Sequence, residues 1–271
     1  MEKEKMMNGI QTVLAILDAD AAPEARDYLG GLLFDEDAET DPFTVANKLL
    51  QCDMPEPLPE VLRDFIEALF TAAYDDGNAD AMNDIGAQYY DGSRGFDQDF
   101  TKAVECYKLA AEKGSRQAQE NLGYCYYYGR NMPVDYEKAF HYFALGAFDG
   151  HLISLYKIGD MYLNGYYVKK NPIEAFHIYE RCLDTMTDEA APVVAGPVFL
   201  RLGNAFLNGS GVNKDAKNAL ICYQKAELYL YDMVAGGNVM YKKSLQAAID
   251  GQAKARELLA QTLPRQEWVF D

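Results

Sequence analysis

Apolar side chains recur with a helical period through most of the chain, and one arrangement of apolar, small and turn-forming residues returns several times. The clearest copy, AQENLGYCYYYGRNMPVDYEKAFHYFALGAFDG, occupies residues 118–150. It predicts a helix that ends at a glycine, a short polar loop, and a second helix that begins after an aspartate. A two-helix unit repeated at this spacing is typical of a solenoid.

Four copies align on a pair made of an apolar residue and a glycine, and the glycines are separated by 37, 36 and 44 residues. The pairs are Ile85–Gly86, Leu122–Gly123, Ile158–Gly159 and Leu202–Gly203. An aromatic residue follows each glycine by three positions: Tyr89, Tyr126, Tyr162 and Phe206. A second glycine follows by six: Gly92, Gly129, Gly165 and Gly209. After the loop come a capping residue, an alanine and an aromatic residue: Asp99, Ala103 and Tyr107; Asp135, Ala139 and Phe143; Asn171, Ala175 and Tyr179; Asp215, Ala219 and Tyr223.

Each of these positions has a physical reason. The small residues of the two helices let the helices approach closely, and the second glycine supplies a left-handed helix end. The aspartate or asparagine accepts hydrogen bonds from the first amides of the second helix, which stabilises it by about 1 kcal/mol. In the third copy Asn171 is followed by Pro172, the residue favoured at the first helical position.

These residues resemble the Sel-1-like repeat, a relative of the tetratricopeptide repeat. Its pattern is A-x-x-x-L-G-x-x-Y-x-x-G, a loop with valine, D-x-x-K-A, and an aromatic residue before A-A-x-x-G. Copies one and two match to their ends, whereas Cys182–Leu183 and Ala226–Glu227 replace the final small pair in copies three and four. The resemblance covers roughly residues 78–230. It implies an all-α, α/α superhelical solenoid of ten to thirteen helices, right-handed, with a concave binding surface.

Three segments are expected on this basis. Residues 1–77 form an N-terminal helical cap that ends in a degenerate half repeat, with helices over 8–18, 23–34, 43–52 and 60–76 and residues 1–7 frayed. Residues 78–235 hold the four repeats, at about 78–114, 115–150, 151–186 and 195–235. Residues 236–271 form C-terminal capping helices, broken near Gly251, and a tail with Trp268, because a solenoid must cover its terminal apolar faces. Residues 184–197 are expected as a loop or an extended helix end.

The charge is strongly negative, with 25 lysines and arginines against 42 aspartates and glutamates and a net charge of −17. This balance opposes nucleic-acid phosphates and anionic membrane surfaces, so neither is expected as a partner. It favours solubility, or attraction to a basic protein. The apolar run at 10–17 is interrupted by Gln11 and Thr12 and followed by Asp18 and Asp20, which favours an amphipathic helix over a signal peptide.

Five cysteines are present. Some secreted relatives of this repeat join the two helices of each unit by a disulfide, but no repeat here has the two cysteines that this requires. Since CxxC is also absent, reduced thiols in the cytoplasm are expected.

The sequence contains no arrangement of residues typical of a catalytic, metal-binding or phosphate-binding site. His141 and His177 share a register in consecutive repeats, which places them about 10 Å apart, too far to share a zinc ion. Gly209-Ser210-Gly211 lacks the Lys-Ser/Thr ending of a phosphate-binding loop. We therefore expect no catalytic residue, no cofactor and no metal, and a non-enzymatic protein.

The remaining candidate for a functional site is a binding surface. The resemblance to tetratricopeptide repeats implies that the concave face is lined by chosen first-helix positions, among them Ala87, Leu163, Leu200 and Leu207. The residues expected there to bind a peptide or protein are Asn83, Tyr90, Asp91, Glu120, Tyr124, Tyr127, Tyr128, Tyr156, Asp160, Asn164, Asn204 and Asn208. Asparagine amides can hold an extended backbone, and tyrosines supply apolar area with little entropy to lose. The alternative is that these tyrosines only pack between repeats.

The resemblance thus implies an adaptor that binds a peptide or protein segment. One alternative is an acidic inhibitor or immunity-type protein that masks a basic partner. A remote alternative is a hydrolase of the β-lactam-binding type, suggested for cysteine-rich relatives.

Overall fold

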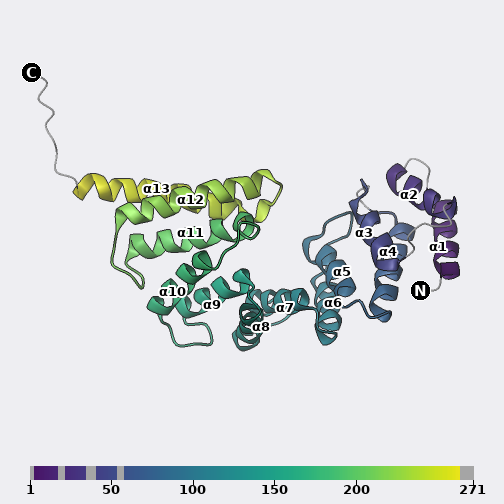
Figure 1. Cartoon of the computed structure of the whole chain (residues 1–271), viewed down its shortest axis with the longest axis horizontal. Coiled ribbons are helices and arrows are strands. Elements are labelled where there is room, and N and C mark those ends of the chain that lie inside the picture. The colour runs from purple at the N-terminus through teal and green to yellow at the C-terminus, as the bar shows by residue number, and fades with distance from the viewer. Residues whose placement is uncertain (1–2, 18–21, 35–40, 54–57, 263–271) are drawn as a thin grey trace, which may run out of the picture. The chain divides into compact units, whose positions relative to one another are not determined.

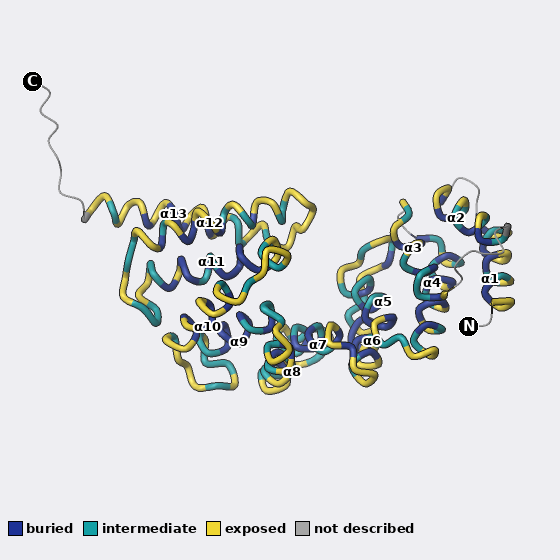
Figure 2. Tube along the Cα trace, viewed as in Figure 1, coloured by how far each residue is buried: buried dark blue, intermediate teal, exposed yellow. Residues whose placement is uncertain are grey.

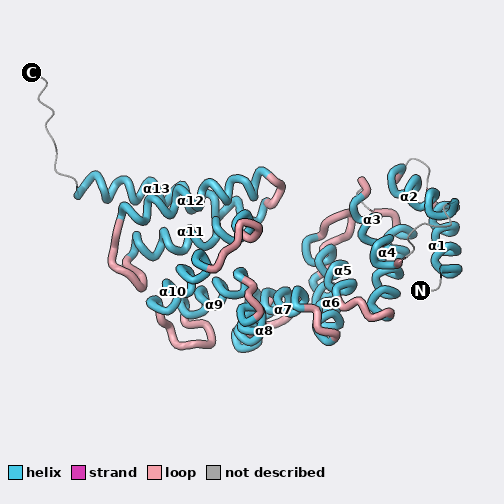
Figure 3. Tube along the Cα trace, viewed as in Figure 1, coloured by secondary structure: helices cyan, strands magenta, loops and turns pink. Residues whose placement is uncertain are grey.

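The computed structural model describes residues 3–17, 22–34, 41–53 and 58–262, and within these ranges it is helical throughout, without strands (Figures 1 and 3). The helices, in chain order, are α1 (Lys3–Ile16), α2 (Pro23–Phe34), α3 (Pro42–Gln51), α4 (Glu60–Asp75), α5 (Asp80–Asp91), α6 (Phe100–Glu112), α7 (Arg116–Tyr128), α8 (Tyr136–Phe148), α9 (Leu152–Asn164), α10 (Pro172–Asp184), α11 (Ala191–Asn208), α12 (Ala216–Ala235), a 3₁₀ turn η1 (Val239–Tyr241) and α13 (Lys242–Thr262). The chain forms two compact units, residues 1–142 and 143–271, which are described in turn.

The first unit holds the N-terminal helices and the first repeats. Each helix from α3 to α7 packs on its neighbour in sequence, and α1 packs on both α2 and α4. Helix α4 lies at the centre of this core, since Leu62, Ile66, Leu69 and Phe70 are fully buried. Figure 2 shows the buried positions as dark blue stretches along the helices. The helix expected over 60–76 therefore contributes one whole face to the core of this unit.

The N-terminal residues differ from the expectation of a frayed segment. Helix α1 begins at Lys3 instead of about residue 8. Met6 is 1% exposed and belongs to the same core as Ile10 and Val13. The three lie on one helical face with spacings of four and three residues, so burial of Met6 holds the first turn in place.

The loops inside the repeats have the conformations that the sequence predicts. Gly92, Gly129, Gly165 and Gly209 end the first helices with left-handed φ values of 63°, 67°, 77° and 70°. The side chains of the four capping residues accept hydrogen bonds from backbone amides in the first turn of the second helix: Asp99, Asp135, Asn171 and Asp215. The repeat register is thus confirmed at both ends of the loop.

The anchor glycines allow an aromatic ring of the second helix to lie on the first. A Cβ atom on Gly86 would lie 2.9 Å from Cε1 of Tyr107, and one on Gly159 would lie 2.6 Å from Cε1 of Tyr179. Both distances are too short for real Cβ atoms. The close approach of the two helices therefore depends on the absence of a side chain at these positions.

The second unit contains α9 to α13, with the end of α8 at its start. Helix α11 begins at Ala191, so the stretch 191–197 is an extended helix end, one of the two alternatives expected, although it contains Pro192 and Pro197. Pro192 lies in the first turn, where a proline displaces no intrahelical hydrogen bond. The extra residues between the third and fourth copies therefore extend a helix.

The C-terminal cap also differs from its prediction at one point. Helix α13 continues through Gly251, which we expected to break it. Gly251 is buried, and a Cβ atom there would lie 2.5 Å from the ring of Tyr223. The absence of a side chain at Gly251 thus allows α13 to pack closely against α12. The tail with Trp268 lies outside the described residues.

Candidate functional site

A group of aromatic side chains gathers around the end of α7 in the first unit. It draws on α5, the start of α6, the C-terminal half of α7, the loop after it and the start of α8. We call it the tyrosine cluster, and its residues are Tyr90, Phe100, Tyr124, Tyr127, Tyr128, Arg130 and Tyr136. It therefore contains four of the twelve residues expected to bind a partner.

The rings of α7 stack on one another. Tyr124 and Tyr128 are one helical turn apart, with ring centroids 6.2 Å apart and an angle of 9° between their planes. Tyr127 makes T-shaped contacts with Tyr128 and with Tyr136 of α8, with ring centroids 4.9 Å and 5.6 Å apart. Tyr128 is 48% exposed, whereas Tyr124 and Tyr127 are half-buried. Tyr128 is thus the solvent-exposed end of the stack, and the neighbouring rings pack against it.

Arg130 lies beside this stack, directly after the left-handed Gly129. Its guanidinium carbon is 4.9 Å from the ring centroid of Phe100, 5.7 Å from that of Tyr128 and 5.9 Å from that of Tyr90. Its Nε donates to the hydroxyl of Tyr90 at 3.4 Å. Burial raises the pKa of Tyr90 despite this contact, so Tyr90 stays a neutral phenol.

The other expected residues of the first unit are placed differently. Asn83 is 6% exposed, and its Oδ1 accepts from Nδ2 of Asn121 at 2.9 Å, which links α5 to α7. Glu120 is 4% exposed, while Asp91 is exposed. Partial desolvation raises the pKa of Asp91. Of the polar positions expected to bind in this unit, only Asp91 offers its side chain at the surface.

In the second unit, Tyr156 and Asp160 of α9 form part of a buried ionic cluster. Arg201 of α11 binds the Asp160 carboxylate through two nitrogens, with Nε–Oδ1 at 2.5 Å and Nη2–Oδ2 at 2.6 Å. Its guanidinium carbon lies 4.5 Å from the ring centroid of Tyr156. Nζ of Lys157 is 3.9 Å from Oδ2 of Asp160. This cluster joins the third and fourth repeats.

The pKa of Asp160 reflects this environment. Burial by itself would raise the pKa, but the charge and hydrogen bonds of Arg201, with Lys157 and the Tyr179 hydroxyl, hold it below the ordinary value. The carboxylate is consequently ionised at neutral pH, with its oxygens engaged by groups of the same unit.

The asparagines of the second unit lie at the surface. Nδ2 of Asn164 donates to the carbonyl of Asp160 at 2.7 Å, and Nδ2 of Asn208 donates to that of Asn204 at 2.9 Å. Oδ1 of Asn204 accepts from the Tyr223 hydroxyl at 2.8 Å. All three side chains thus have contacts within their own repeats.

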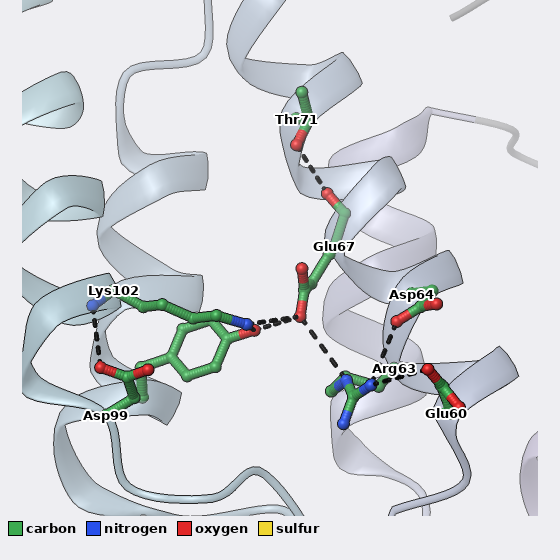
Figure 4. A network of polar contacts seen from close by, with 8 residues as sticks. Glu60, Arg63, Asp64, Glu67, Thr71, Asp99 and Lys102 are labelled. Carbon is green, nitrogen blue, oxygen red and sulfur yellow. Dashed lines mark hydrogen bonds and ion pairs between the residues drawn. The ribbon is translucent and has the colours of Figure 1, made fainter.

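A third polar network links α4 to the first repeat (Figure 4). Glu67 accepts the hydroxyl of Tyr89, and Nζ of Lys102 donates to the same hydroxyl at 2.9 Å. Lys102 and Arg63 approach Glu67 at 3.9 and 3.8 Å. Burial, followed by the bond to Glu67, raises the pKa of Tyr89. This phenol therefore stays protonated, and the network serves to join the N-terminal helices to the repeats.

The described residues contain no group of three or more histidine, cysteine or carboxylate side chains that could hold a metal ion. The five cysteines are unpaired. Burial raises the pKa of Cys125 and of Cys182 to about 12, so both are poor nucleophiles at neutral pH. His141 and His177 are exposed.

Sequence reasoning did not single out Phe100, Arg130, Tyr136 or Arg201. Arg130 follows the capping glycine, where the other copies have Ser93, Tyr166 and Ser210. The departure from the repeat pattern at this position is the signal that could have found Arg130.

Comparisons with known proteins identify the repeat. A family model described as Sel1 repeat matches residues 79–115, 116–151, 152–181 and 200–227. The protein sel-1 homolog 2 of Mus musculus is 33% identical over 147 residues, which are 54% of this chain and 21% of that protein. The ERAD-associated E3 ubiquitin-protein ligase component HRD3B of Arabidopsis thaliana is 38% identical over 80 residues, 30% of this chain and 13% of that protein. The chain thus spans about a fifth or less of the length of these curated relatives.

A solved structure supports the fold. The crystal structure of a Sel1 repeat protein from Oxalobacter formigenes superimposes with a TM-score of 0.59 at 21% identity, covering 98% of this chain and 99% of that one. The all-α solenoid class is therefore confirmed. Of the helices that the structure describes, none is long and apolar enough to cross a membrane.

Proposed function

Because the chain belongs to the Sel1 repeat family, we propose that it is a non-enzymatic scaffold that binds a peptide or protein segment through the tyrosine cluster. Sel1 repeat proteins generally serve as protein-interaction scaffolds. The observation that carries the proposal is Tyr128, which is 48% exposed although it lies within a stack of aromatic rings.

The physical support comes from the energetics of interfaces. An exposed tyrosine that its neighbours already hold in place has little conformational entropy left to lose when a partner covers it. Aromatic residues with a polar tip are enriched among the residues that dominate binding energy. The rings of Tyr124 and Tyr127 both contact that of Tyr128, so Tyr128 is held by its neighbours in this way.

The expected residues of the second unit are not assigned to this binding surface. Tyr156 and Asp160 are 3% and 8% exposed, and the ionic cluster uses both. Asn164, Asn204 and Asn208 are exposed, and their side chains make hydrogen bonds within their own repeats. We therefore assign the principal contacts to the first unit.

The test is affinity capture with matched tyrosine variants. We expect Tyr124→Ala combined with Tyr128→Ala to lose the proteins that the wild-type chain captures from its native cell extract. The matched control is Tyr231→Ala, which removes a tyrosine that is 62% exposed on α12 of the second unit. Circular dichroism should show unchanged helix content in all variants. Equal capture by the double variant and the wild type would contradict the proposal.

A second candidate function is that of an acidic inhibitor that masks a basic partner, which the net charge of −17 favours. Long-range attraction between opposite charges falls steeply with salt, because the Debye length drops from about 10 Å at 0.1 M to about 3 Å at 1 M. Capture that is lost at high salt in the wild type and unaffected by the tyrosine variants would favour this candidate.

We place the scaffold in a reducing compartment such as the cytoplasm. The five free cysteines support this placement, because thiols stay reduced in the cytosol whereas disulfides form and persist in oxidising compartments.

A further inference from the structure

Arg130 is held by aromatic rings from three helices. Tyr90 comes from α5, Phe100 from α6 and Tyr128 from α7, with ring centroids 4.9 to 5.9 Å from the guanidinium carbon. Arginine is suited to such a place, because its planar guanidinium is weakly hydrated and stacks on aromatic rings. The rings thus fix the position of a cation beside the exposed Tyr128.

The charge of Arg130 is not neutralised by a neighbouring acid. Within the described part of the chain, no carboxylate lies within ion-pair distance of Arg130, and its terminal nitrogens Nη1 and Nη2 have no hydrogen-bond partner. Two other arginines do have carboxylate partners. Arg201 binds Asp160 through two nitrogens, and Arg63 lies within 4 Å of three carboxylates. The chain has 42 acidic residues, yet none of those that the structure describes forms an ion pair with Arg130.

The remaining donors of Arg130 match one chemical group. When aromatic rings cover the faces of a guanidinium, its N–H groups point outward in the guanidinium plane. Two of them can meet the two oxygens of a carboxylate in parallel, which is the strongest common arrangement of charge-assisted hydrogen bonds. A neutral amide, with one acceptor oxygen, can use only part of this geometry.

We propose that Arg130, within the cage of Tyr90, Phe100 and Tyr128, is a receptor for the carboxylate of an aspartate or glutamate side chain in the bound segment. This inference rests on the function proposed above and specifies the chemistry of the partner. The negative charge of the rest of the chain repels acidic segments in general, so Arg130 makes an acid acceptable at one position of the segment. Charge complementarity of this kind sets specificity and register.

The test uses a positional-scanning library of short peptides that are acetylated at the N-terminus and amidated at the C-terminus, so that side chains supply the only carboxylates. We expect the wild-type chain to select aspartate or glutamate at one position, next to aromatic or apolar residues. In fluorescence anisotropy, exchanging that acid for its amide should weaken binding about tenfold, which is about 1.4 kcal/mol, because the amide is neutral and offers only one acceptor oxygen.

Arg130→Met preserves the unbranched stem that packs on the rings and removes the donors. We expect it to bind the acidic peptide about tenfold more weakly and to bind the acid and amide peptides equally. The matched control is Arg94→Met, which removes the same charge from an exposed arginine in the loop before α6 and should leave the preference for the acid intact. A thermal melt followed by circular dichroism checks that each variant is folded.

The failure of this inference can be told apart from that of the proposed function. Peptides that depend on Tyr128 for binding but show no preference for an acid would contradict the carboxylate receptor and not the scaffold function. A preference for an acid that Arg130→Met retains would do the same. A parallel library with free C-termini is the check on the source of the carboxylate: peptides that bind only from that library would also overturn the receptor, because a terminal carboxylate would then be the ligand. Absence of any Tyr128-dependent peptide binding would contradict both.

Discussion

The hydroxyl of Tyr179 donates a hydrogen bond to Oδ1 of Asp160 at 2.8 Å. This bond joins the two helices of the third repeat. Tyr223 and Asn204 make the equivalent bond in the fourth repeat, also at 2.8 Å. In both repeats the acceptor directly follows the anchor glycine on which the tyrosine ring lies. In the second repeat the aromatic residue is Phe143, which has no hydroxyl, and Tyr124 in the acceptor's place belongs to the tyrosine cluster. The same position thus serves stability in one unit and a candidate binding surface in the other.

The Asp160–Arg201 pair should dominate the stability of the second unit. We expect Asp160→Ala to lower the free energy of unfolding by about 3–5 kcal/mol, because it leaves the mostly buried charge of Arg201 without a partner. Urea unfolding measures the change. Asp184→Ala, which removes an exposed acid at the end of α10, is the control and should have an effect within about 0.5 kcal/mol. Equal effects of the two substitutions would contradict the structural role of the pair.

The same carboxylate should make stability depend on pH in a defined direction. The folded-state pKa of Asp160 is lowered, so its contribution is complete above the unfolded pKa of about 3.9 and is lost as pH falls through the folded value. We expect the stability difference between the wild type and Asp160→Asn to be constant near neutral pH and to shrink only below about pH 4. Unfolding curves at a series of pH values test this, and a difference that already changes between about pH 6 and pH 8 would argue against it.

The anchor glycines can be tested against a glycine that has free space around it. Gly86→Ala should destabilise the first unit by about 1–3 kcal/mol, because the new Cβ would collide with the ring of Tyr107. Gly31 lies inside α2, and a Cβ atom there would have no neighbour within 4 Å, so Gly31→Ala should stabilise by about 0.5–1 kcal/mol. Thermal unfolding of both variants is the measurement. A neutral or stabilising Gly86→Ala would mean that the helices do not need this close contact.

The thiols should react in the order of their burial. The pKa of Cys125 and of Cys182 is raised to about 12 by burial, so few thiolates form there at mild alkaline pH, whereas Cys52 is half-buried. Alkylation of the native protein, followed by mass spectrometry, should label Cys52 before Cys125 and Cys182, and unfolding should expose all five. Rapid labelling of Cys125 in the folded protein would show that its core opens readily.

Local features of the fold were predictable from sequence. The left-handed glycines and the capping residues follow from rules that act within a few residues, and the repeat placed them four times in register. The start of α1 was missed because the burial of Met6 depends on its packing in the core of the unit. Gly251 was misread as a helix break because its role depends on Tyr223, a residue of another helix.

The candidate site was predictable only in part. Tyr124, Tyr127 and Tyr128 stand out because they depart from the repeat pattern. The burial of Asp160 was not predictable, because its partner Arg201 lies 41 residues away in the chain. Arg130 was missed for a related reason, since the rings that hold it come from three different helices.

Site-specific photo-crosslinking tests the central claim most directly. A photoreactive phenylalanine analogue replaces Tyr128 in the tyrosine cluster or, as the control, Tyr231 on α12, and the cells that contain each variant are irradiated. Because Tyr128 should lie against the bound segment, we expect a discrete crosslinked partner from position 128 and none from position 231. The crosslinked product should disappear when Tyr124→Ala is added. Crosslinks from position 231 alone, or equal crosslinks from both positions, would contradict a binding surface at the tyrosine cluster.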